Sequence, residues 1–224
     1  MASYKLNVAR IRGCAAPAEL AEALAQYGLP EDDEFGVLNH SAAGENVFGT
    51  IVRRTQQSVQ QLDPETKEVA SAPVDRVQVY AFAVRPAAET LELYSGSKAA
   101  FEQMGFFFGS CLAMPAVVDA IEVDVPDALE KLQGLTEKFQ LKSLRVGDFA
   151  YNSYMAGPYT PKFLDSEHGK DFLEANADSV TAANVRFAGP MGRVNAKITP
   201  NACFGFSCHE DDRPVVMSIL RKLV

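Results

Sequence analysis

One local arrangement of strands and a helix is indicated twice in this chain. In residues 77–113 an apolar strand (VQVYAFAV), a short turn and a second strand (TLELYSG) precede an apolar helix. The same order occurs in residues 193–224, where RVNAKI, TPNA and CFGFSC lead into EDDRPVVMSILRKLV. Strands that return on themselves and then bury one face under a helix restrict the chain to a mixed architecture of sheet and helix layers.

The remaining patterns extend both copies and predict an α+β fold. A strand at 4–12 and a helix over Pro17–Tyr27 precede the first copy, and a strand at 118–125 and a helix at 127–139 precede the second. Each half therefore reads as strand, helix, antiparallel strands and helix. We expect either duplicated ferredoxin-like (βαββα) halves or one continuous antiparallel sheet with helices on one face.

The predicted division of the chain follows from this duplication. The first half covers residues 1–116 and carries a polar hairpin arm at about 55–76, whose middle is too hydrophilic to be core. The second half covers residues 117–224 and carries an insertion at about 150–183 that contains a short helix. We expect the two halves to form one compact unit.

Composition and charge favour a soluble, cytoplasmic protein. The chain has 224 residues, 47% of them hydrophobic and 22% charged, and no apolar run approaches the roughly 20 residues of a membrane-spanning helix. The amino terminus shows no secretory leader, and the four cysteines are too scattered for a disulfide framework. The net charge of −8 argues against broad affinity for nucleic acid or anionic membrane.

No metal site or cofactor is expected. Cys203 and Cys208 lie five residues apart on a predicted strand, so their side chains point to opposite faces. His209 and the acidic residues after it resemble a helix amino terminus, where negative side chains complement the helix dipole. Phosphate-binding loops of the G-x-x-x-x-G-K-[ST] or G-x-G-x-x-G type are absent from the sequence.

A catalytic centre is weakly indicated. The three histidines, His40, His168 and His209, lie in polar segments without a nucleophile motif. His40, in the predicted polar loop NHSAAGEN, and His209 are the weak candidates for catalysis. The sequence therefore leans toward a protein without enzymatic activity.

Nucleic-acid binding is the alternative function. Phe204 and Phe206 share one face of the strand CFGFSC, where they would either stack on bases or form core. Dispersed arginines could line a groove along the arm, namely Arg53, Arg54, Arg76, Arg85 and Arg145. The expected architecture resembles the duplicated ferredoxin-like modules of CRISPR RNA-processing subunits at the level of fold. That resemblance implies a module of a defence or genome-maintenance system that binds or processes RNA or DNA.

Protein partnership is the first hypothesis. The helix segment MGFFFGSCLAM is apolar around most of its circumference, and its Gly105 and Gly109 would allow a second backbone to approach. The candidate partner-binding residues are Gly105, Phe106, Phe107, Gly109, Tyr151, Tyr154 and Tyr159. We therefore expect a non-enzymatic binding or scaffold protein, either a homo-oligomer or a subunit of a larger assembly.

Overall fold

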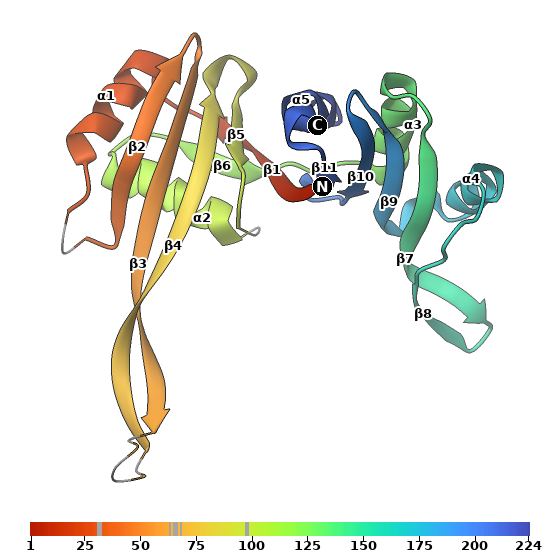
Figure 1. Ribbon diagram of the computed structural model, residues 1–224, viewed down its shortest axis with the longest axis horizontal. Coiled ribbons are helices and arrows are strands. Elements are labelled where there is room, and N and C mark those ends of the chain that lie inside the picture. Colours follow the sequence, from red (N-terminus) through yellow and green to blue (C-terminus); the bar gives the residue numbers. More distant parts are fainter. Residues whose placement is uncertain (31–32, 63, 65–66, 68, 97–98) are drawn as a thin grey trace. The chain divides into compact units, whose positions relative to one another are not determined.

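The structure is a computed structural model that describes residues 1–30, 33–62, 64, 67, 69–96 and 99–224. It is a mixed α+β protein that divides into two compact units, each built on antiparallel strand pairs (Figure 1). The N-terminal unit is Ile11–Val118, and the C-terminal unit combines Met1–Arg10 with Asp119–Val224. Among the described residues, no helix is long and apolar enough to cross a membrane.

The N-terminal unit is a meander of four strands with two helices on one face. Its strands follow one another in space in the order β2-β3-β4-β5. Its elements are α1 (Pro17–Tyr27), β2 (Phe35–Ala43), β3 (Asn46–Leu62), β4 (Val69–Arg85), a 3-10 turn (Pro86–Ala88), β5 (Thr90–Leu93), α2 (Ala99–Phe106) and a π-helical turn (Phe107–Cys111).

Aromatic packing fixes the helices of this unit against its sheet. The fully buried Phe108, from the π-helical turn, meets Phe82 of β4 edge to face with ring centroids 5.8 Å apart. Gly49 lies under the same ring, because a Cβ there would stand 2.6 Å from Phe82. Among the described residues of this unit, the other face of the sheet has no helix.

Strands β3 and β4 continue beyond the sheet as a two-stranded arm (Figure 1). Strand β2 pairs with β3 only as far as Arg53, whereas β3 and β4 stay paired out to Leu62 and Val69. Of the predicted arm at 55–76, residues 63, 65, 66 and 68 lie outside the described residues. Val59, Leu62 and Val69 are exposed, so these apolar side chains of the arm are not buried in a core.

The strands of the C-terminal unit follow the order β1-β11-β10-β9-β7-β8, and β6 pairs with β1 off this path. Its elements are β1 (Ala2–Arg12, which continues into the other unit), β6 (Val117–Ala120), α3 (Val125–Leu135), β7 (Gln140–Asn152), β8 (Met155–Tyr159), α4 (Ser166–Ala175), a 3-10 turn (Ala177–Ser179), β9 (Val180–Gly189), β10 (Gly192–Ile198), β11 (Cys203–Cys208), a 3-10 turn (Glu210–Asp212) and α5 (Arg213–Arg221). Strand β1 pairs with β11, so the first residues of the chain belong to the sheet of the C-terminal half.

Helices α3 and α5 bury one face of this sheet. Phe204, Phe206 and Leu6 point to that face and are buried. The buried Asp212, just before α5, accepts a hydrogen bond from the Met191 amide at 2.9 Å and so fixes the β9–β10 turn.

Three local predictions differ from the structure. Four strands (β2 to β5) lie between α1 and α2, and five strands (β7 to β11) with helix α4 lie between α3 and α5, so the ferredoxin-like arrangement is not confirmed although the α+β class is. The predicted polar loop around His40 is instead strand β2, because this segment pairs along β3 as far as Ala43. The predicted strand at 118–125 ends early: β6 stops at Ala120, and Val125 begins α3 after the capping residue Asp124.

Candidate nucleic-acid interface

Two rows of small polar and basic residues cross the helix-free face of the C-terminal unit. Directly paired residues of neighbouring strands share a face, and alternate residues point to opposite faces. The residues between the buried Phe204 and Phe206 therefore belong to the face away from α3 and α5. One row is Gln140, Arg186, Asn195, Ser207 and Ser3, and the next is Ser143, Asn184, Lys197, Gly205 and Lys5.

This face carries five cations. We call it the basic face and define it by Lys5, Arg145, Arg186, Arg193 and Lys197, which the strand register places on the same side. Strands β1, β9, β10 and β11 contain no aspartate or glutamate, nor does β7 before Asp148. In the described part of the chain, none of the five cations forms an ion pair.

Hydrogen bonds hold the polar rows in place. The Nε of Arg186 donates to Oδ1 of Asn195 at 3.1 Å, and Asn195 Nδ2 donates to Ser207 Oγ at 3.5 Å. In the second row, Asn184 Nδ2 donates to Ser143 Oγ at 2.8 Å. The first bond orients the planar guanidinium of Arg186 and leaves its two terminal nitrogens to bind an anion.

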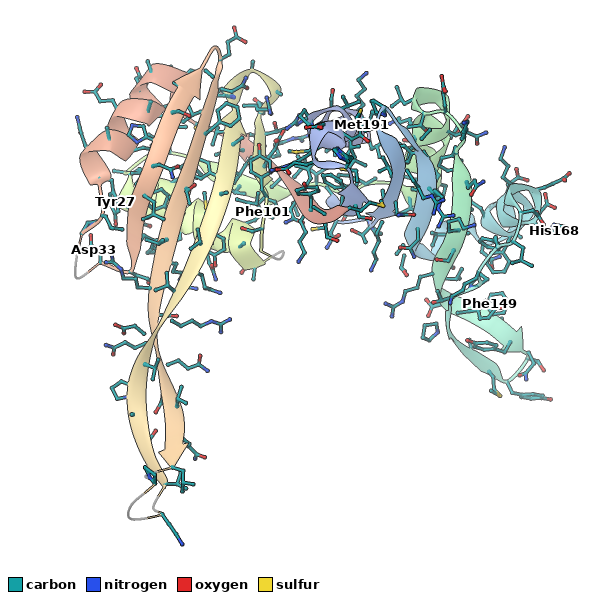
Figure 2. The ribbon with its side chains drawn as sticks, viewed as in Figure 1. Tyr27, Asp33, Phe101, Phe149, His168 and Met191 are labelled. Carbon is teal, nitrogen blue, oxygen red and sulfur yellow. The ribbon has the colours of Figure 1, made fainter. Side chains whose placement is uncertain are left out.

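A hollow of about 570 Å³ adjoins the basic face at the β9–β10 turn. Lys138, Arg186 and Arg193 line it, together with Gln140 and the turn residues. Met191, labelled in Figure 2, belongs to this turn and is held by Asp212. Three cations around one hollow favour a bound anion such as phosphate.

Gly205 opens a notch in the middle of the face. In the register it lies between Lys197 of β10 and Lys5 of β1. No atom lies within 4 Å of the position that a Cβ of residue 205 would take. The backbone is therefore accessible between two ammonium groups, a position where a phosphate or sugar can approach closely.

The structure separates the residues predicted for nucleic-acid binding. Arg145 is exposed and lies on the basic face, paired with Ala182. Phe204 and Phe206 are buried under the helices, so they form core and offer no ring for base stacking.

The other four predicted arginines belong to the N-terminal unit. Arg53 forms an ion pair with Glu34, and Arg85 pairs with Glu92 at 2.6 Å. Arg54 donates a hydrogen bond to the carbonyl of residue 30, and Arg76 is exposed on the arm. These arginines do not gather into one cationic groove.

The residues predicted on the apolar helix for partner binding pack mostly within the N-terminal unit. Phe107 is fully buried. A Cβ on Gly105 would touch Val118, and one on Gly109 would lie about 4 Å from the carbonyls of residues 114 and 116. The two glycines thus make room for the chain's own return segment, and Phe106 is the one large apolar side chain of MGFFFGSCLAM that the structure leaves well exposed among the described residues.

The three predicted tyrosines lie on the β7–β8 hairpin. The Tyr151 hydroxyl donates to the carbonyl of Pro158 at 2.7 Å, and Tyr159 packs on Phe149 with ring centroids 4.7 Å apart. Figure 2 labels Phe149 at the start of this aromatic cluster. Tyr154 is 94% exposed and contributes no ring contact among the described residues.

The histidines do not come together. His40 is exposed on β2, and His209 accepts a weak hydrogen bond from the Asp211 amide at 3.4 Å, as a capping residue does. His168 contacts the Asp165 carboxylate through Nδ1 at 2.9 Å, which raises the pKa of the imidazole. Across the described ranges, no group of three or more His, Cys, Asp or Glu side chains is placed to hold a metal ion.

Most of the basic face was missed from the sequence. The sequence did not indicate four cations of the basic face as nucleic-acid-binding residues, namely Lys5, Arg186, Arg193 and Lys197, nor Lys138 in the adjoining hollow. Each is an isolated cation in an acidic chain. A usable signal exists nevertheless: the predicted strands at 4–12 and 193–198 contain Lys and Arg but no Asp or Glu, and the predicted strand at 203–208 contains no charged residue. Charge counted strand by strand would have shown the segregation that the total charge conceals.

No protein-family model matches this chain, and no curated protein matches its sequence. The function proposed for it is therefore drawn from the geometry and charge of its own residues.

Proposed function

We propose that this protein is a non-catalytic binding protein that holds single-stranded nucleic acid on the basic face of its C-terminal unit. The observation that carries the proposal is the segregation of charge: five cations share a sheet face on which β1, β9, β10 and β11 contain no aspartate or glutamate and β7 contains only Asp148, in a chain with a net charge of −8. Like charges repel one another, and a polyanion relieves that repulsion while it releases its own counterions.

The form of the face favours a single strand over a duplex. Five neighbouring strands span about 19 Å from the first to the last, given the usual spacing of about 4.8 Å. Amide and hydroxyl groups of Asn184, Asn195 and Ser207 lie between the cations and can hydrogen-bond to phosphates, sugars or unpaired base edges. A duplex is usually read by a helix or ribbon that enters a groove.

The mode of binding follows from what the face contains. Both phenylalanines of β11 are buried, so base stacking on these rings does not contribute. Phosphate contacts then dominate the affinity. We expect weak sequence preference and a steep loss of affinity with salt, with about 0.7 counterions released per neutralised phosphate of a single strand.

Fluorescence anisotropy with labelled single-stranded DNA and RNA tests the proposal. The test variant combines four substitutions on the face: Lys5→Gln, Arg186→Gln, Arg193→Gln and Lys197→Gln. The control removes the same charge elsewhere: Lys67→Gln, Arg76→Gln, Lys131→Gln and Lys222→Gln. We expect the slope of log affinity against log salt to fall by about 3 in the test variant, as four lost phosphate contacts imply, and to change little in the control.

Two outcomes would overturn this proposal. The first is equal binding by the test and control variants, which would assign the affinity to overall charge. The second is the absence of binding to any single strand at low salt. Tighter binding to duplex than to single strands would replace the proposed ligand by double-stranded nucleic acid.

Scaffolding of a protein assembly is the second candidate function. It is favoured by the β7–β8 hairpin, which exposes Tyr154 and Met155 near its turn. Aromatic and methionine side chains are enriched at protein interfaces. Light scattering and co-purification test this candidate, and a strict monomer without a partner would count against it.

A further inference from the structure

A second surface of the C-terminal unit is a groove between helices α3 and α4. It has a volume of about 550 Å³. Leu129 of α3, Leu173 of α4 and the neighbouring Phe139 and Leu141 give it an apolar floor. Leu141 pairs with the buried Val185, so the groove opens on the helix side of the sheet, away from the basic face.

The insertion at 150–183 builds one wall of this groove. Helix α4 begins after Asp165, whose carboxylate accepts a hydrogen bond from the His168 amide at 3.0 Å. Gly169 lets the helix approach β7 closely, since a Cβ there would stand 3.3 Å from Leu141 and from Phe163. Helix α4 is thus held at the sheet beside α3, and the space between the two helices stays open.

The rim of the groove carries three carboxylates and one ammonium group. Asp127 and Glu130 come from α3, and Glu174 comes from α4 together with Lys170. Asp127 is paired with Lys131 at 2.8 Å. Within the described residues, Glu130 and Glu174 form no ion pair, so each wall carries one carboxylate without a direct partner beside an apolar floor, and Lys170 lies one turn before Glu174.

We propose that this groove binds an amphipathic helix of a partner protein, with apolar side chains against the floor and lysine or arginine along both flanks. An amphipathic helix laid in an apolar groove is a recurring mode of peptide recognition. Glu130 and Glu174, which form no direct ion pair among the described residues, favour a cationic group on either side of that helix. They also repel nucleic acid, so the ligand of the basic face and the partner helix do not compete for one surface.

This inference goes beyond nucleic-acid binding and does not depend on it. The two ligands occupy opposite faces of one sheet, which allows both to be bound at once. The protein would then join a nucleic acid to a second protein through a single unit of its fold.

Binding of designed peptides to the full-length protein tests the inference. The probe is a labelled helical peptide with leucines at i, i+3, i+4 and i+7 and lysines on both flanks. One comparison peptide carries glutamates on the flanks, and another has the probe's composition with its leucines scattered around the helix. We expect the cationic amphipathic peptide to bind at least about tenfold more tightly than either comparison peptide.

A charge-reversal variant locates the binding. The double variant Glu130→Lys and Glu174→Lys changes two exposed helix positions. It should lower the affinity for the cationic peptide at least about tenfold and raise the affinity for the anionic peptide. Glu19→Lys with Glu22→Lys makes the same charge change on exposed positions of α1, outside the groove, and should leave peptide binding within about twofold of the unsubstituted protein.

The contrary results are equally definite. An equal loss of peptide affinity in both variants would mean that the peptide responds to net charge alone. Equal binding of the peptide with scattered leucines would mean that the apolar groove is not the binding site. Failure of the probe to bind at low salt would also overturn the inference. Nucleic-acid affinity, measured on the same variants, reports on the basic face and keeps the two proposals distinguishable.

Discussion

The helix-free sheet faces of the two units differ in whether their charged side chains form ion pairs. On the N-terminal unit, Arg85 lies 2.6 Å from the nearly fully buried Glu92, whose second oxygen accepts the Tyr94 hydroxyl at 3.0 Å. On the C-terminal unit, Lys5 and Lys197 lie on neighbouring strands β1, β11 and β10 that contain no aspartate or glutamate. The first arrangement satisfies its charges within the fold, and the second leaves them for a ligand.

This contrast separates charges that stabilise from charges that bind. A buried carboxylate keeps its ionised form only with donors and cations close to it, so the Arg85–Glu92 pair is part of the core. Clustered cations on a surface gain nothing from one another and destabilise the fold slightly by repulsion. The same substitution, arginine or lysine to alanine, should therefore affect unfolding in one unit and ligand affinity in the other.

The largest expected effect on stability is that of Arg85→Ala. It removes a charged hydrogen bond from a carboxylate that is 1% exposed, and the free energy of unfolding should fall by about 2 kcal/mol. Urea unfolding followed by circular dichroism measures the change. Arg76→Ala, on the exposed arm, serves as the control and should stay within about 0.5 kcal/mol. If Arg85→Ala lowered the free energy of unfolding as little as the control does, the proposed difference between the two units would be wrong.

Gly205→Glu should abolish most nucleic-acid binding without unfolding the sheet. The position has open space for a side chain, and the new carboxylate would lie between Lys5 and Lys197 and neutralise them. We expect affinity for a single strand to fall at least tenfold, or about 1.4 kcal/mol. Gly205→Ala adds only a methyl group and should bind within about twofold of the unsubstituted protein. Unchanged affinity in Gly205→Glu would place the ligand elsewhere.

Lys197→Ala should behave in the reverse manner to Arg85→Ala. Because the ammonium group is exposed and forms no ion pair in the described structure, the unfolding free energy should change by less than about 0.5 kcal/mol. The salt slope for single-strand binding should decrease by about 0.7, the contribution of one phosphate contact. Unfolding and anisotropy measured on the same sample test both halves of this statement.

The smallest effect on stability is expected at the exposed cap of α4, where the His168 imidazole and the Asp165 carboxylate form a hydrogen bond. Hydrogen bonding to Asp165 raises the pKa of His168, and the same contact lowers the pKa of Asp165. The imidazolium form therefore stabilises the cap below the unfolded-state pKa of histidine, and this stabilisation is lost as the pH rises through the folded-state pKa. An NMR titration should show a lower His168 pKa in Asp165→Asn, and an unchanged value would contradict the contact.

Local sequence signals predicted several elements correctly. Helix α1 spans Pro17–Tyr27 as predicted, because a proline in the first turn, apolar residues at one spacing and Gly28 at its end agree. Strand β11 likewise follows its alternating pattern. Strand β2 was missed because its outer half is polar and takes its conformation from pairing with β3, which no local pattern records.

The candidate sites depend on long-range register, which explains why the sequence showed them poorly. The basic face exists because β1, from the start of the chain, pairs with β11 near its end and brings Lys5 beside Gly205. The hollow requires the amide of Ala188 to bond to the carbonyl of Glu137 at 2.9 Å, which brings Lys138 to the β9–β10 turn. Neither contact has a signature in one sequence.

A titration of isotope-labelled protein with single-stranded nucleic acid, followed by amide NMR, tests the central claim most directly. We predict chemical-shift changes at Lys5, Lys197 and Gly205 and along the rest of the two polar rows, with little change on the arm or on the face that carries Arg85. Shifts concentrated in the N-terminal unit, or no shifts at low salt, would contradict the assignment of the binding surface.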